Sequence, residues 1–178
     1  MKNLKQISQI GLMASLMGVA AFAQAANGTA GTTSTGTMNL SVIVPKIVVI
    51  KNVTSPAAVT FNGSTAVNLS SSLCVGTNAT GYTITATSTN AAAGAPFILS
   101  DGTNTVAYNV AWATSAGATT GTAFGSSGAT QSYATGPVSN IACAANNATA
   151  VITVPAANLQ TAPASTYSDT LSLTVAPL

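Results

Sequence analysis

Short runs of alternating apolar and polar residues recur along this chain and restrict it to an all-β fold. In residues 82–87 a tyrosine, an isoleucine and an alanine alternate with threonines, and a period of two returns at 106–112 and 171–175. A period of two places every second side chain on one face of a strand. Turn residues such as Asn62-Gly63 separate the runs. This pattern is typical of a sandwich or barrel, and we expect an all-β sandwich.

Weaker signals complete the expected set of strands. Further strands are predicted at 37–44, 47–50, 59–61, 66–69, 97–99 and 150–154, and one helical turn at 156–159. Leu171, Leu173 and Val175 share one face of the last run, which we expect to lie at the centre of the core. Residues 113–136 are nearly all small, so this stretch is either a hairpin around Gly125–Gly128 or a surface loop that binds a ligand.

The N-terminus has the three parts of a secretory signal peptide. Lys2 and Lys5 are followed by an apolar run over 10–22 and by Ala23-Gln24-Ala25, the small-residue pattern of a cleavage site. The run is shorter than the roughly 20 residues of a membrane-spanning helix. We therefore expect a signal peptide at 1–25, a flexible leader at 26–36 and a single domain at 37–178. The exported chain would pass through the periplasm to the cell surface or the medium, with no membrane span.

Charged side chains are nearly absent. The chain has four basic and two acidic residues and no histidine, and only 3% of its residues are charged, whereas a typical domain has about 25%. After removal of the signal peptide, Lys46, Lys51, Asp101 and Asp169 remain. Two lysines cannot form a phosphate-binding face, so nucleic acid is excluded as a partner. A neutral surface favours self-association.

The same scarcity argues against catalysis. Serine and cysteine hydrolase sites of the common kinds need a histidine. Asp101 and Asp169 both lie in turn-like contexts, where aspartate usually bonds its own backbone. The sequence contains no zinc-ligand cluster and no glycine-rich phosphate loop, and it has too few carboxylates for calcium. We expect a non-catalytic protein without a cofactor or metal.

Cys74 and Cys143 are the only cysteines. Two cysteines in an exported chain predict one disulfide. No charged residue lies near either one in the sequence to activate a thiolate, so the expected role is structural. A loop of this length gives about 4 kcal/mol of stabilisation in the chain-entropy model.

Three segments resemble the spore coat protein U domain family. Cys74 followed by Gly-Tyr-Thr-Ile-Thr at 81–85 resembles the start of that domain, residues 101–110 resemble its central hairpin, and residues 162–175 are similar to its closing segment. The closing segment, in which a proline-containing turn, a tyrosine and an aspartate precede the last strand, is the most specific of the three. Pilins of the family have a cysteine soon after the N-terminal strand, whereas here the first is Cys74.

The resemblance implies a fold, a function and partners. Family members include pilins of archaic chaperone–usher pili, whose immunoglobulin-like sandwich lacks a strand that the N-terminal segment of a neighbouring subunit supplies. The expectation is therefore a structural subunit of an extracellular fibre for surface attachment or biofilm. Its partners would be like subunits, a periplasmic chaperone and an outer-membrane usher.

Two interpretations of residues 37–44 remain open at this point. The segment is either a donor strand for a neighbouring subunit, with Met38, Leu40, Val42 and Val44 as its inserting side chains, or the first strand of its own domain. An alternative function is a self-contained secreted binding module or adhesin. Its ligand would contact residues 113–136 and three aromatic side chains, Trp112, Phe124 and Tyr133.

Overall fold

The structure is a computed structural model that describes residues 25–134 and 141–178. The predicted signal peptide lies outside the described residues, apart from Ala25. The chain consists of two units, Met1–Val44 and Pro45–Leu178, and each is taken by itself.

The described part of the first unit, residues 25–44, contains a small hairpin followed by a segment without strand pairing. β1 (Ala25–Ala26) pairs antiparallel with β2 (Thr37–Met38). The predicted strand at 37–44 thus forms only over its first two residues, and every side chain from 25 to 44 is exposed. We call residues 37–44 the arm.

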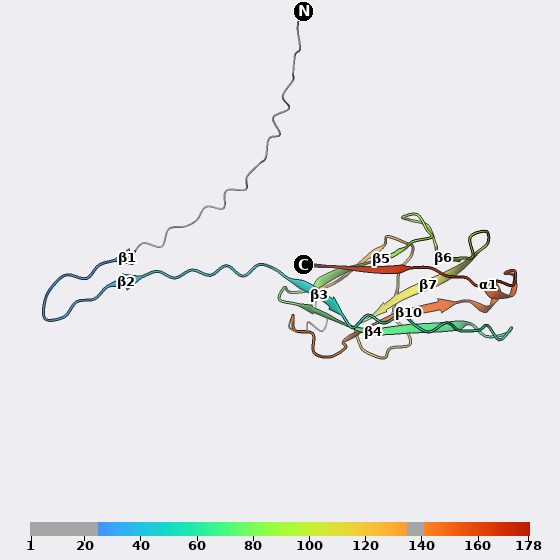
Figure 1. Cartoon of the computed structure of the whole chain (residues 1–178), viewed down its shortest axis with the longest axis horizontal. Coiled ribbons are helices and arrows are strands. Elements are labelled where there is room, and N and C mark those ends of the chain that lie inside the picture. Colours follow the sequence, from blue (N-terminus) through green and yellow to red (C-terminus); the bar gives the residue numbers. More distant parts are fainter. Residues whose placement is uncertain (1–24, 135–140) are drawn as a thin grey trace, which may run out of the picture. The chain divides into compact units, whose positions relative to one another are not determined.

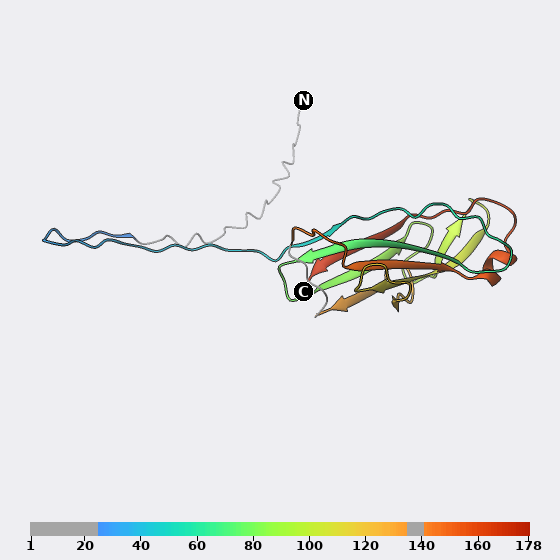
Figure 2. The same cartoon turned by 90° about the horizontal axis from the view of Figure 1, so that it is seen from below.

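The second unit is an all-β sandwich, as the alternating runs predict (Figures 1 and 2). One layer has the strand order β3-β4-β10-β7-β6, with β8 also pairing with β7, and the other has the order β11-β5-β9. All neighbouring strands are antiparallel. The strands of the first layer are β3 (Val48–Lys51), β4 (Val67–Thr77), β6 (Phe97–Ser100), β7 (Thr105–Ala113), β8 (Thr122–Ala123) and β10 (Ala148–Val154). Those of the second are β5 (Tyr82–Ser88), β9 (Thr130–Tyr133) and β11 (Leu171–Pro177).

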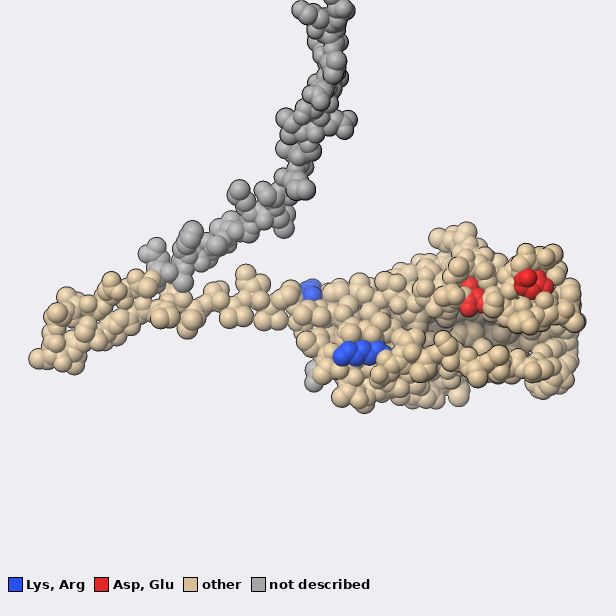
Figure 3. Space-filling view, viewed as in Figure 1, with Lys and Arg blue, Asp and Glu red and all other residues tan. Residues whose placement is uncertain are grey.

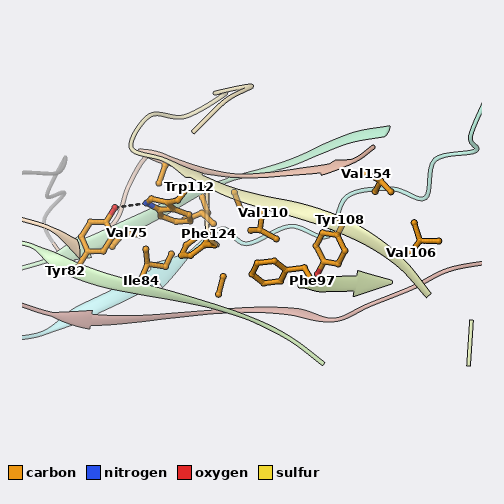
Figure 4. Close-up of a cluster of buried hydrophobic side chains, with 14 residues drawn as sticks. Val75, Tyr82, Ile84, Phe97, Val106, Tyr108, Val110, Trp112, Phe124 and Val154 are labelled. Carbon is orange, nitrogen blue, oxygen red and sulfur yellow. Dashed lines mark hydrogen bonds between the residues drawn. The ribbon is translucent and has the colours of Figure 1, made fainter. Parts of the chain in front are cut away.

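The core lies between the two layers and follows the predicted parity. Alternate residues of β5 and β7 are buried, and the threonines between the buried residues of β5 face outward. Trp112 is 1% exposed, and its indole Nε1 donates a hydrogen bond of 3.1 Å to the Tyr82 hydroxyl (Figure 4). Farther along the core, the rings of Phe97 and Tyr108 lie 5.6 Å apart. The hydrogen bond to Tyr82 satisfies an indole donor that would be costly to bury without a partner.

The predicted disulfide is confirmed. Cys74, on β4, and Cys143 are bonded, with their Cα atoms 5.7 Å apart. Both are buried. Cys143 has a positive φ of 52°, so the bond holds the loop before β10 in an uncommon backbone conformation.

Residues 113–134 do not form the hairpin considered around Gly125–Gly128, while a ligand-binding role for this stretch stays a prediction. β8 pairs with β7 and β9 pairs with β5, so these two strands belong to different layers and no hairpin forms around Gly125–Gly128. Between β7 and β8 the chain covers the outer face of the first layer. There the buried Thr149 hydroxyl donates to the Ser115 carbonyl and accepts from the amide of Ala118. Tertiary hydrogen bonds, which the composition does not reveal, place this stretch.

Two smaller predictions have opposite outcomes. The helical turn expected at 156–159 is α1 (Ala156–Gln160). The strand expected at 59–61 does not form, and these residues have no strand partner in the described chain. Within the residues the structure describes, no helix is long and apolar enough to cross a membrane.

Candidate functional site

An open groove of about 970 Å³ lies between the two layers of the sandwich. Its floor is made of inward-facing side chains, mostly aliphatic, of both layers. One side is the extended segment 53–61, here called the strap, and the opposite side is the segment 162–170, here called the wall. The floor residues are Val67, Leu69, Ser71, Leu99, Tyr108, Ala150, Ile152, Val154, Leu159, Leu171 and Leu173.

β11 forms one border of this groove because it is an edge strand. It pairs with β5 along its whole length. No strand of the described chain is hydrogen-bonded to its other edge, although β3 lies close to it. Leu171, Leu173 and Val175 do share the inward face, as predicted, but they are only partly buried. By contrast Ile84 and Ala86, on the neighbouring β5, are 0% exposed. The expectation that this strand lies at the centre of the core is therefore wrong, because β11 is the last strand of its layer and its inward side chains are only partly covered.

The strap forms the second border and has unused backbone groups. β3 pairs with β4 from Val48↔Thr77 to Lys51↔Cys74, and Asn52 then leaves the strand with a positive φ of 61°. Beyond it, the strap is bonded to a side chain of β4 and not to its backbone: the Thr54 amide donates to the Ser71 hydroxyl over 3.1 Å. No backbone–backbone hydrogen bond joins residues 53–61 to another part of the described chain. Extended backbone of this kind is a template for strand addition.

The wall is fixed at its end by Asp169. Its Oδ1 accepts hydrogen bonds from the amides of Thr89, Asn90 and Thr170 at 3.1, 3.2 and 2.8 Å. Its Oδ2 accepts from the Tyr108 hydroxyl at 2.5 Å. One carboxylate therefore joins the end of β5, the middle of β7 and the start of β11.

The four predicted donor residues are exposed and uncovered. Met38, Leu40, Val42 and Val44 are 72%, 87%, 86% and 73% exposed. Beyond Met38 the arm has no strand partner in the described chain. Exposed runs of aliphatic side chains are typical of interaction sites.

The aromatic residues of the alternative binding module do not form a surface. Trp112 and Phe124 are buried at 1% and 5% exposure. Tyr133 is partly buried, its ring stacks on Tyr82 at 5.6 Å, and its hydroxyl donates to Gln131. These three side chains belong to the core and its edge, so they cannot form an exposed platform for a sugar.

Charged groups are few, and the described ones have structural partners. Asp101 accepts hydrogen bonds from the amides of Asn104 and Thr103, and these bonds hold the pKa of its carboxyl well below its usual range. The Lys46 and Lys51 ammonium groups donate to the carbonyls of Leu178 and Ala142. Figure 3 shows how small the charged areas are on the visible face. Among residues 25–134 and 141–178, no group of three or more potential metal ligands occurs.

No protein-family model matches the chain, and no curated protein matches it.

Proposed function

We propose that this protein is a non-catalytic structural subunit of an extracellular fibre, in which the arm of one subunit fills the groove of the next. The carrying observation is the open groove beside the free edge of β11, in a chain that also has an exposed, alternating apolar arm. An exposed apolar arm and an open groove with an aliphatic floor are each unfavourable in water, and binding of the arm in the groove would bury both apolar surfaces.

The chemistry of the arm fits the groove in two ways. Its backbone would add a strand between the free edge of β11 and the unpaired strap, which is recognition by strand addition. Its side chains at 38, 40, 42 and 44 would contact the half-buried aliphatic floor, and burial of each large aliphatic group is worth roughly 1.5–3 kcal/mol. The intervening Asn39 and Ser41 would face water. Neither the arm nor the floor contains a charged residue, so no ion would be desolvated.

A chain that carries both an arm and a groove assembles head to tail. Such a contact is heterologous, and it produces an open filament unless the rotation closes a ring. The resemblance supports the same assignment and extends it to a periplasmic chaperone and an outer-membrane usher as partners, and to attachment or biofilm at the cell surface. No observation favours the self-contained binding module, since Trp112 and Phe124 are buried and Tyr133 is partly buried.

The test is the exported, processed chain with Leu40→Asp, compared with Ser41→Asp. The two variants add the same charge to adjacent arm positions, but only residue 40 would enter the apolar groove, where an unpaired carboxylate is costly. We expect polymers from the parent and from Ser41→Asp, and none from Leu40→Asp, by size-exclusion chromatography with light scattering. A parent chain that stays a monodisperse monomer, or a Leu40→Asp chain that polymerises like the parent, would contradict the proposal.

A further inference from the structure

Asp169 and Tyr108 form a hydrogen bond between the wall of the groove and its mostly aliphatic floor. Both residues line the groove, and Tyr108 is 5% exposed. A buried phenol needs a hydrogen-bond partner, and the Asp169 carboxylate 2.5 Å away provides one. Burial of the phenol, together with this carboxylate, raises the pKa of Tyr108, so its hydroxyl stays protonated and remains a donor.

The contact has consequences on both sides of the groove. On the floor, it fixes the orientation of the Tyr108 ring, which packs against Phe97 in the core (Figure 4). On the wall, the same carboxylate binds three amides, and next to it the Asn90 side-chain amide donates to the Ser168 carbonyl over 2.8 Å. The remaining wall residues have few backbone bonds that tie them to either sheet. Ser168 exchanges two with Ser100, and no other wall residue before Thr170 bonds to a strand of the described chain through its backbone.

Asp101 is a natural comparison. It is the only other acidic residue of the chain, and it too accepts two backbone amides, at 2.9 and 2.6 Å. Its bonds from backbone amides stay within the turn between β6 and β7. Its carboxylate also interacts with the Ser165 side chain of the wall, but Asp101 itself does not line the groove and does not contact the floor. Both aspartates therefore accept hydrogen bonds from nearby backbone amides, but only Asp169 also accepts one from a floor residue, Tyr108.

From this geometry we infer that the Tyr108–Asp169 pair is a positioning latch, which sets the shape of one part of the groove and thereby the affinity for the arm. The inference rests on the proposed function. Both are positioning residues: they act on the arm by holding the floor and the wall in place. Loss of the latch hydrogen bond would leave the sandwich folded, because Tyr108→Phe keeps the aromatic ring in the core and Asp169→Asn changes no core residue, but it would let the wall move away from the floor.

The experiment measures arm binding separately from folding. A fluorescent peptide with the sequence of residues 37–44 is titrated by anisotropy into the full mature chain carrying Leu40→Asp, whose own arm no longer competes. Further variants on this background are Tyr108→Phe, Asp169→Asn, the two combined, and Asp101→Asn as control. All titrations are run well below each variant's melting temperature, where every chain is folded and lower stability alone leaves the Kd unchanged.

We expect Tyr108→Phe and Asp169→Asn each to weaken peptide binding about tenfold, which is the effect of roughly one charge-assisted hydrogen bond. The combined variant should bind the peptide no more weakly than the single variant that binds it more weakly, because both substitutions break the same contact. Asp101→Asn should change the Kd less than about twofold while it lowers the melting temperature.

Each contrary result has a distinct meaning. If the Leu40→Asp chain binds the peptide and the same chain with Tyr108→Phe binds it equally well, the latch inference is wrong and the fibre proposal stands. If Asp101→Asn weakens binding as much as Asp169→Asn does, the effect is general and the latch is also wrong. If the Leu40→Asp chain does not bind the peptide, both the latch inference and the proposed contact between arm and groove are wrong.

Discussion

At the scale of single residues, the two aspartates show how one local context can lead to different roles. Both occur in turn-like sequences, and both accept hydrogen bonds from nearby backbone amides, as expected of turn aspartates. The backbone bonds of Asp101 stay within its own turn, whereas Asp169 also reaches Thr89 and Tyr108, far away in the sequence. Only the position of β7 and β5 beside the start of β11 creates this second role.

Asp101 gives a prediction about acid stability. Backbone hydrogen bonds lower its pKa in the folded state, so its contribution is present above the unfolded-state pKa of about 3.9 and is lost progressively as the pH falls below that value. Asp101→Asn should therefore lower the melting temperature at pH 7, and the difference from the parent should shrink below about pH 4. Thermal unfolding of both proteins between pH 7 and pH 2 checks this. A difference that is constant across the range would show that the charge of Asp101 is not involved.

At the scale of elements, an edge strand and a covered strand differ although their patterns match. β5 and β11 both alternate, and they pair with each other from Leu171↔Ser88 to Pro177↔Tyr82. β5 has neighbours on both sides, and its inward residues are fully buried. β11 has one neighbour in the described chain, and its inward residues are half-buried at the groove.

This difference predicts unequal effects of the same substitution. Ile84→Asp should abolish folding, because a carboxylate with no partner at 0% exposure costs several kcal/mol, a large share of a total stability of about 5–15 kcal/mol. Leu173→Asp should give a folded but less stable chain, since the open groove lets water reach the carboxylate. It should also lose binding of the arm peptide. Circular dichroism melting and peptide anisotropy measure the two effects. A Leu173→Asp chain that fails to fold would indicate that β11 is central to the core.

At the scale of the whole molecule, the sandwich has its own core without any residue of the arm. The described core residues all belong to the unit Pro45–Leu178, and so does the disulfide. The arm contributes no buried side chain. The donor-strand and own-first-strand interpretations of residues 37–44 therefore make opposite predictions for a chain that lacks these residues.

Removal of the arm tests this separation. A mature chain without residues 26–44 should fold and melt within a few degrees of the Leu40→Asp chain, because no core contact is lost. Adding the arm peptide in large excess over its Kd should raise the melting temperature, since a ligand bound only to the folded state stabilises it by mass action, about 2.7 kcal/mol at 100 times the Kd. The same peptide with aspartate at position 40 serves as control and should not. An arm-deleted chain that is unfolded would restore the own-strand interpretation.

Much of the fold could be predicted from the sequence because the information is local. A period of two identifies strands and assigns each side chain to a face, so the pattern by itself places Ile84, Val110 and Trp112 on inward faces. The pair Cys74–Cys143 could be predicted because these are the only two cysteines of the chain. The sequence also allowed the hypothesis that the arm is a donor strand, since the alternation of its residues is visible without knowledge of its neighbours.

The groove could not be predicted, because it depends on strand order rather than on strand pattern. Alternation does not distinguish a strand with two neighbours from one with a single neighbour, so Leu173 and Ile84 look equivalent in the sequence. Likewise, no local pattern shows that the chain leaves the sheet at Asn52, so that residues 59–61 form no strand. Nor does any local pattern show that β8 and β9 join different layers. The sequence by itself determined which side chains face inward. Only the tertiary structure decided which of them remain uncovered, because that depends on hydrogen bonds between strands far apart along the chain.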